Sequence, residues 1–193
     1  MKTLPVILIS IYLFTSCKKD TNACKDYKEI SGQKQLVDVS NINAPELIDT
    51  LNKHPELQLY SFKTSSTGWV ARCNIFYKHL IIFTENYLIN KGYNTGFIYA
   101  SDTLRPQNIS ISLEPLISYQ DAIKTAKQYI NFDHTCISYR LGIYNTDISR
   151  RALKSYKLVW KIEGANHFPY AFIDAESKTV LMMDNGIRTG FID

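Results

Sequence analysis

The chain has 193 residues, of which 45% are hydrophobic, and its 22 basic and 18 acidic side chains give a formal net charge of +4. This excess of positive charge is small and scattered, so we expect no nucleic-acid partner. Beyond a polar N-terminal region about 150 residues remain, which is enough for one domain with a real core or for two very small ones.

The first sixteen residues have the pattern of a secretory signal. Lys2 precedes a largely apolar run over residues 4–14, and the chain then turns abruptly polar. The apolar run is about 11 residues long, well short of the roughly 20 that a membrane-spanning helix needs. We therefore expect residues 1–16 to be a signal peptide that is removed after export.

Cys17 stands directly after this signal. Together with Phe14 and Ser16 it resembles the lipobox of bacterial lipoproteins, although Phe14 replaces the more usual Leu. The resemblance implies cleavage between Ser16 and Cys17 and anchoring to the membrane through acyl chains such as palmitate on Cys17. Lys18 follows instead of an aspartate, which favours the cell outer membrane, facing the periplasm or the cell surface. The alternative is an ordinary secretory signal followed by an accidental cysteine.

Residues 17–43 are polar with few large apolar groups, which predicts a lipidated N-terminus and a flexible tether. Lipidation of Cys17 leaves three cysteines, so at least one of them has no internal partner. Cys24 lies in the tether. The internal disulfide that is still possible therefore joins Cys73 to Cys136. Export to an oxidising compartment permits such a bond.

Residues 44–114 are predicted to form a strand-rich α+β unit. Pro45 opens a short helical pattern, and the pair His54-Pro55 ends it, because a residue before proline avoids helical angles. Segments rich in Tyr, Phe, Ile and Val then alternate with turn residues and are typical of successive strands. The predicted strands cover residues 57–64, 68–78, 79–91, 96–101 and 108–113.

Residues 115–193 are predicted to form a second α+β unit. Ser118 is placed to cap a helix over residues 119–130, with Ala122, Ile123, Ala126, Tyr129 and Ile130 as its apolar stripe. Four strands are predicted to follow, over residues 136–145, 155–164, 168–174 and 178–184. Alternation places Trp160 inward and Arg140, Lys157, Lys161 and Glu163 outward. The pattern predicts a helix packed on an antiparallel sheet whose other face is solvated.

Three motifs within residues 118–184 follow one order: the capped helix SYQDAIKTAKQYI, the strand YKLVWKIEG and the hairpin YAFIDAESKTVL. In this order the segment resembles the PepSY family, whose members show an Ala-rich helix, a Trp or Tyr in that strand and an Asp-Ala-x-Thr-Gly turn. Ser177 and Lys178 depart from the Thr and Gly of that turn. The resemblance implies a PepSY/cystatin-like fold. The first half follows a comparable order of helix and strands. It is expected to be a second, related unit in tandem, with strands that extend the same sheet as the alternative.

PepSY-like modules occur as pro-segments of secreted metallopeptidases and as separate envelope proteins, and they are proposed to restrain peptidases or to bind partners. The resemblance implies a non-enzymatic protein without catalytic residues or cofactors, which binds a protein partner and can restrain a secreted or envelope peptidase. Two alternatives stay open. The 13 tyrosines suit a lipoprotein that binds glycans or small molecules, and an uncharacterised hydrolase is the third hypothesis.

One cluster of residues has the composition of a reactive site. Asp133, His134 and Cys136 are close in sequence, and with Cys73 they offer zinc ligands or a Cys-His nucleophile pair. The plainer interpretation is a helix-to-strand connection with a half-buried cysteine. The histidines are otherwise scattered, so no metal site is predicted.

The carboxylates of Asp174 and Glu176 stand two apart between apolar runs. We interpret them as parts of a hairpin turn, in which Asp174 accepts hydrogen bonds from backbone N–H groups and Glu176 projects into water. Lys178 occupies the position where the family favours glycine. A left-handed backbone there disfavours lysine relative to glycine.

Overall fold

The structure is a computed structural model that describes residues 27–29, 37–94, 96, 98–100, 109–132, 136–147 and 155–185. Ser16 and Cys17 lie outside these ranges, as do Asp133 and His134. The chain is a mixed α+β protein, as predicted. Across the described ranges, every helix is too short or too polar to cross a bilayer.

The first half consists of a short helix and an antiparallel meander. Pro45 occupies the first turn of α1, and the helix stops before His54, as expected. Residues 109–113, which were predicted as a strand, have no regular structure. The elements are α1 (Pro45–Lys53), β2 (Leu57–Ser65), β3 (Gly68–Tyr77), β4 (Leu80–Gly92) and β5 (Ile98–Ala100).

The second half repeats this order of elements. The hydroxyl of Ser118 accepts a hydrogen bond from the backbone N–H of Asp121 at 3.2 Å, which confirms the predicted cap. The elements are α2 (Tyr119–Ala126), β6 (Ser138–Asn145), β7 (Tyr156–Glu163), the 3-10 turn η2 (Ala165–His167), β8 (Tyr170–Asp174) and β9 (Val180–Asp184).

Helix α2 ends four residues earlier than predicted. The backbone N–H groups of Gln128 and Tyr129 bond to carbonyls three residues back, at Thr125 and Ala126. These tighter turns rotate the chain away from the helical periodicity. As a result Ile130 is buried, but Tyr129, which was assigned to the same apolar stripe, is 59% exposed.

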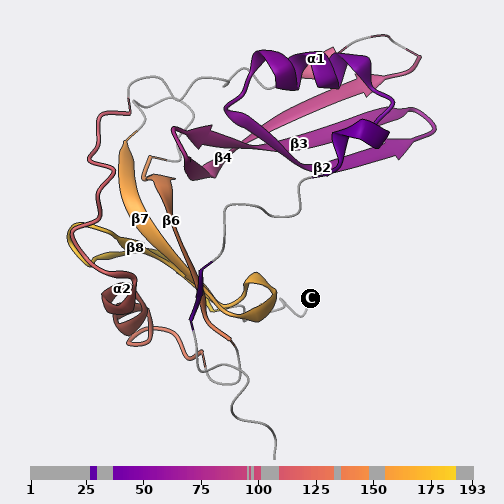
Figure 1. Cartoon of the computed structure of the whole chain (residues 1–193). Coiled ribbons are helices and arrows are strands. Elements are labelled where there is room, and N and C mark those ends of the chain that lie inside the picture. The colour runs from indigo at the N-terminus through magenta and orange to yellow at the C-terminus, as the bar shows by residue number, and fades with distance from the viewer. Residues whose placement is uncertain are drawn as a thin grey trace, which may run out of the picture.

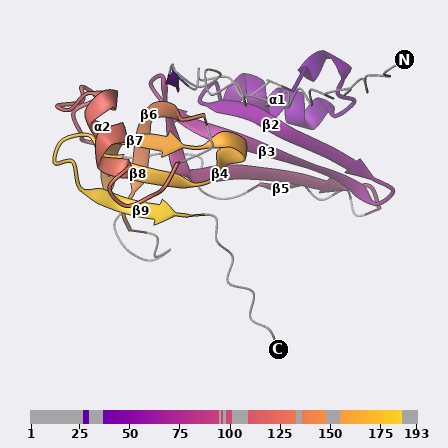
Figure 2. The same ribbon diagram turned by 90° about the horizontal axis from the view of Figure 1, so that it is seen from below.

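The two halves share one continuous sheet with the order β2-β3-β4-β6-β7-β8-β9. Strands β4 and β6 join them through a short parallel pairing, in which Ile81 faces Gly142 and Ile82 faces Ile143. Figures 1 and 2 show α1 beside β2–β4 and α2 beside β6–β8. The long strand β4 thus pairs with β3, with β5 and with β6.

Both helices pack on the main hydrophobic core. Leu47 of α1 and Ile123 of α2 belong to one buried cluster, with Ile75 and Trp160 from the sheet. The indole N–H of Trp160 donates to the carbonyl of Ile117 at 3.0 Å, so the ring satisfies its polar atom while buried.

The helix-free face of β6–β8 is not the solvated face that was predicted. Val159 is fully buried there, and Glu163 is only 3% exposed. Tyr144, Val159 and Phe172 form a second apolar cluster, against which Phe83 of β4 packs. One reason is the junction between the halves, because β4 pairs with β6 and its Phe83 side chain packs against this cluster.

Parts of the expected tether are ordered against the domain. Strand β1 (Lys28–Glu29) pairs in parallel with β6, and Lys28 N–H donates to the carbonyl of Ile137 at 3.2 Å. Further along, Val37 packs on the main core beside the 3-10 turn η1 (Val39–Asn41). These described stretches of residues 17–43 therefore belong to the folded domain.

Candidate functional site

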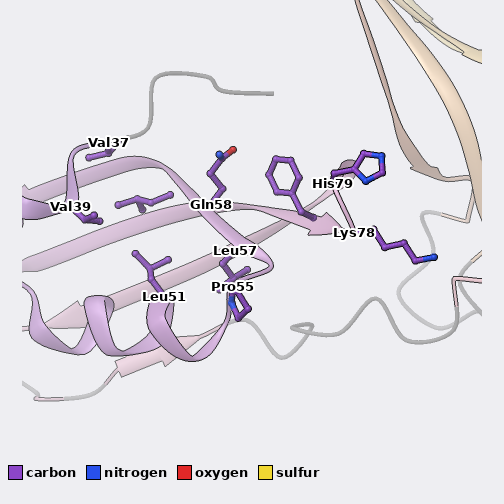
Figure 3. Close-up of a pocket in the computed structure, with 10 residues that line it drawn as sticks. Val37, Val39, Leu51, Pro55, Leu57, Gln58, Lys78 and His79 are labelled. Carbon is purple, nitrogen blue, oxygen red and sulfur yellow. The ribbon is translucent and has the colours of Figure 1, made fainter. Parts of the chain in front are cut away.

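An apolar groove of about 510 Å³ runs between helix α1 and the edge strand β2. Figure 3 shows Val37 and Val39 at one end, Lys78 and His79 at the other, and Leu51 rising from α1 between them. Val39 is 41% exposed although its neighbours are apolar. The remaining lining residues are Pro55, Leu57, Gln58, Leu59 and Phe76.

Strand β2 is the terminal strand of the sheet on this side. Its inner edge pairs with β3, and no described strand pairs with its outer edge. A β-bulge between Leu59 and Ser61 interrupts the register, a device that limits uncontrolled pairing at sheet edges. Backbone hydrogen-bonding groups therefore stand beside the apolar groove, which is the arrangement that binds added strands.

A polar pocket of about 250 Å³ opens on the helix-free face of the sheet, where the two halves meet. The ring of Phe76 connects it to the groove, because this ring lines the groove and also lies 5.7 Å from the guanidinium carbon of Arg140. Asn86 is exposed at the rim of the pocket. The lining residues are Tyr60, Asn74, Ile81, Phe83, Asn86, Arg140, Lys161 and Glu163.

The charges in this polar pocket come from two paired strands. Arg140 of β6 lies directly opposite Lys161 of β7 in the sheet register. The Lys161 ammonium contacts Oε2 of Glu163, and Nδ1 of His167 lies 3.1 Å from Oε1 of the same carboxylate. Two cations and one carboxylate thus line the pocket.

Burial acts on the pKa values of these groups in opposite ways. It lowers the pKa of the Arg140 guanidinium below its ordinary value, an effect that Glu163 opposes. Burial alone would raise the pKa of Glu163, but Lys161 and His167 outweigh it and hold this pKa below the usual range. Glu163 is therefore ionised at neutral pH, and the pocket retains both signs of charge.

The aromatic rings of the helix-free face pack on one another. Phe168, Tyr170 and Phe172 follow in a row, with ring centroids 5.6 and 5.7 Å apart, and Phe83 lies 5.2 Å from Phe172. The exposed rings of the described residues instead lie in four separate segments, at Tyr27, Tyr93, Tyr129 and Phe168.

Asp174 holds the hairpin between β8 and β9. Its Oδ1 accepts hydrogen bonds from the N–H groups of Glu176 and Ser177 at 2.8 and 3.0 Å, and its Oδ2 pairs with Lys157. Burial would raise the pKa of this carboxyl, but the Lys157 ammonium and the two N–H groups lower it below the ordinary value. Both carboxylate oxygens of Asp174 thus have a structural partner, as expected of a residue that stabilises a turn and not of a general base.

Lys178 adopts the left-handed backbone conformation, with φ of 64°. Its ammonium lies 3.3 Å from Oδ1 of Asp121 at the start of α2, and both side chains are about half exposed. The turn therefore also contacts the helix.

The expected disulfide between Cys73 and Cys136 is wrong. Cys73 is a free thiol in the main core, and burial raises its pKa to about 12. Cys136 lies exposed before β6 and is disulfide-bonded, with its partner outside the described residues. Because Cys136 is disulfide-bonded and Cys73 is a free thiol, these two cysteines do not form a bridge with each other.

The disulfide bond of Cys136 also excludes the zinc binding and the nucleophilic role that were considered for its thiolate. A cysteine in a disulfide is neither a zinc ligand nor a nucleophile. Within the described part of the chain, no three His, Cys, Asp or Glu side chains are grouped to hold a metal ion.

The polar pocket was not predicted from the sequence, although one sequence pattern indicated which charged residues share a face. The alternation of β6 and β7 assigned Arg140, Lys161 and Glu163 to one face. Their burial depends on the pairing of β4 with β6, whose paired residues are about sixty positions apart in the chain. No local sequence pattern indicates this pairing.

No family model matches the chain, and no curated protein matches it. Among solved structures it is similar to the Bacillus megaterium YpeB C-terminal domain, with 15% sequence identity and a TM-score of 0.47. The match covers 72% of this chain and 62% of that domain, which is less than two thirds of its length.

Proposed function

We propose that this protein is a lipid-anchored, non-enzymatic component of the bacterial cell envelope that binds an extended segment of a protein partner in the groove between α1 and β2. The observation that carries the proposal is the position of an apolar groove beside an edge of β2 with which no described strand pairs. Main-chain hydrogen bonds to such an edge supply affinity, and pockets for alternate side chains supply specificity.

The PepSY resemblance of residues 118–184 supports a binding role and indicates a secreted or envelope peptidase as the class of partner. The repeated order of helix and antiparallel strands supports two PepSY-like units in tandem. In such a pair the first unit provides the groove and five of the residues that line the polar pocket, and the second unit provides the three charged residues of that pocket.

The groove is tested with two matched valine variants of the chain that starts at residue 17 and carries Cys17→Ser for solubility. Val39 is 41% exposed in the groove, and Val70 is 38% exposed on β3, outside it. Peptides are selected from a random decapeptide display on the unsubstituted chain, and their affinities are measured by titration. We expect Val39→Glu to weaken the selected peptides about tenfold or more, because it places a charge in an apolar groove, while Val70→Glu has no effect.

The same pair of variants identifies the partner. Envelope extracts are passed over unsubstituted, Val39→Glu and Val70→Glu baits, and the partner is the protein that only the Val39→Glu bait loses. A display that selects no peptide, or peptides that bind both variants equally, would exclude the groove as the binding site.

The anchor is tested separately from binding. Cells are fed an alkyne analogue of palmitate, and we expect the intact chain to be labelled and to fractionate with the outer membrane. A Cys17→Ser chain should be unlabelled and released into the periplasmic fraction. Labelling that survives the substitution would contradict the proposed lipidation site.

A further inference from the structure

We infer that the groove between α1 and β2 binds the C-terminal end of a polypeptide, with that chain antiparallel to β2 and its α-carboxylate at Lys78 and His79. The inference rests on the proposed function for the groove as the binding site, and it adds which end of the partner enters the groove and in which direction. Its own basis is the distribution of charge along the groove and the direction of β2.

The charge of the groove is concentrated at one end. Among the described residues that line it, the ionisable ones are Lys78 and His79, and both are basic and exposed. They form the two-residue loop between β3 and β4, because Tyr77 pairs with Leu80, and Figure 3 shows them together at one end. The other described lining residues are apolar apart from Gln58. An extended ligand therefore gains most when its anionic end lies beside this loop.

No carboxylate among the described residues forms an ion pair with Lys78. Its ammonium lies 5.5 Å from the centroid of the Tyr77 ring, a contact that leaves its N–H donors without an anionic acceptor. The carboxylate of Glu56, just before β2, instead lies 3.2 Å from Nδ1 of His54. An incoming carboxylate thus meets a cation that the described part of the chain does not neutralise.

The backbone of Lys78 gives the cation no local reason to be in this loop. Its φ of 47° lies in the left-handed region. Glycine and asparagine favour such hairpin positions, and a lysine there is strained by about 1 kcal/mol. Strain of this kind is retained at binding sites, where the side chain offsets its cost.

The direction of β2 decides which end of a ligand reaches the two cations. Leu57, the first residue of β2, lies opposite Ile75, and β3 continues from there to Tyr77 and the loop. The loop therefore stands at the N-terminal end of β2. A strand antiparallel to β2 runs toward the loop and brings its C-terminus there, whereas a parallel strand would bring its N-terminal ammonium against the cations.

Two backbone positions at this end of β2 offer no donor to a carboxylate. The N–H of Leu57 already donates to the carbonyl of His54 at 2.9 Å. Pro55 lines the groove and has no N–H. The carboxylate is therefore bound by side chains, through the ammonium of Lys78 and an imidazole N–H of His79.

The short regular part of β2 favours a chain terminus over an acidic side chain. The bulge between Leu59 and Ser61 leaves the three residues Leu57–Leu59 in regular register at this end. They match roughly three residues of an added strand, at about 3.4 Å per residue. Side chains stand perpendicular to a sheet, but the α-carboxylate continues the line of the strand and so reaches the loop.

The test uses random heptapeptides displayed through their N-termini, so that each ends in a free carboxylate, on the chain that starts at residue 17 with Cys17→Ser. Selected peptides are synthesised as acids, as C-terminal amides, and as amides that end in an added glutamate. We expect the acids to bind about tenfold more tightly than the amides in titrations, because the amide loses a charge-assisted contact. The glutamate amides should bind like the plain amides.

Substitutions in the loop separate the carboxylate contact from the rest of the groove. Lys78→Asn removes the cation and suits the left-handed backbone, so it should fold. It should abolish the preference for acids and leave the affinity of the amides unchanged, while Lys78→Arg should keep the preference. Lys63→Asn, at an exposed lysine of β2 outside the groove, is the matched control and should change neither affinity.

A nitroxide at the N-terminus of a selected peptide reports its direction by NMR. It should broaden the amide signal of Val39 more than that of His79. Broadening in the reverse order, equal binding of acids and amides, glutamate amides as tight as acids, or equal effects of Lys78→Asn and Lys63→Asn would overturn the inference.

A failure of the inference alone differs from a failure of the groove. In the first case acids and amides bind equally, and Val39→Glu weakens both. In the second case Val39→Glu weakens neither form, which contradicts the proposed function together with the inference that rests on it.

Discussion

Phe83 of β4 packs against Gly142 of β6 where the two halves of the sheet meet. A Cβ atom at position 142 would lie 2.8 Å from Cζ of Phe83 and 2.8 Å from the carbonyl oxygen of Ile81. Real Cβ atoms essentially never approach other atoms so closely. The parallel contact between β4 and β6 therefore depends on a residue without a side chain.

Gly142→Ala should destabilise the protein by about 1–3 kcal/mol, the usual cost of overpacking a well-packed site. The free energy of unfolding is measured by chemical denaturation. In a Phe83→Leu background the cost should be smaller, because the flexible leucine can move while the ring cannot. An alanine variant as stable as the parent would show that β4 and β6 are not in such close contact.

The sequence predicted helices and strands correctly where residues close in the chain determine them. Ser118 begins α2 because its hydroxyl caps the helix, and the alternation from Tyr156 to Glu163 correctly gave a strand. Turn residues marked most strand ends in the first half. These features depend on contacts between residues close in sequence.

Long-range contacts account for what the sequence could not predict. The strand pairing of Ile81 with Gly142 buries Glu163 and creates the polar pocket, although neither strand is unusual in composition. The tether residues Lys28 and Glu29 pair with β6 through backbone groups, which carry no side-chain signal. Cys73 and Cys136 had compatible chemistry, but only the fold shows that Cys73 is a buried free thiol while Cys136 lies exposed before β6.

Lys178→Gly should stabilise the protein by about 1 kcal/mol, because lysine in the left-handed region is strained relative to glycine. The substitution also removes the contact with Asp121, which contributes little because both groups are exposed. Lys178→Ala is the matched control, since it loses the same contact and keeps the strain. If glycine and alanine had the same thermal unfolding temperature, the backbone at this position would not be left-handed.

Asp174→Asn should lower stability by about 1–3 kcal/mol near neutral pH, because Lys157 loses its buried anionic partner. The amide oxygen can still accept the N–H groups of the turn, so the hairpin should survive.

The pH dependence of this difference follows from the pKa of Asp174, which is lower in the folded state than the ordinary value of 3.8. The stabilisation by the ionised carboxyl is thus fully present above about pH 4 and is lost as the pH falls through the folded pKa. We expect the difference in the free energy of unfolding between the parent and Asp174→Asn to disappear at acidic pH. Denaturation curves that stay equally separated at pH 7 and pH 2.5 would contradict this assignment.

Cys73 should resist alkylation in the folded protein, because burial raises the pKa of its thiol to about 12 and excludes reagents. Iodoacetamide at pH 8 should label it only after unfolding in denaturant. Cys73 is free, and we propose that Cys17 is acylated, so we expect Cys24 to be the partner of Cys136. Mass spectrometry of a non-reduced digest should find these two cysteines linked, and a peptide that joins Cys73 to Cys136 would refute the arrangement.

The pairing of β1 with β6 fixes the position of the first described residues on the domain. Tyr27 precedes this strand, and its hydroxyl accepts a hydrogen bond from the Lys127 ammonium at 3.2 Å. In the lipoprotein that we propose, the acylated Cys17 lies ten residues before Tyr27 in the sequence. Ten residues extend at most about 35 Å, which keeps the domain within a few nanometres of the bilayer. A partner confined to the same layer would meet the groove at an effective concentration of about a millimolar, so an intrinsically weak contact can be well occupied.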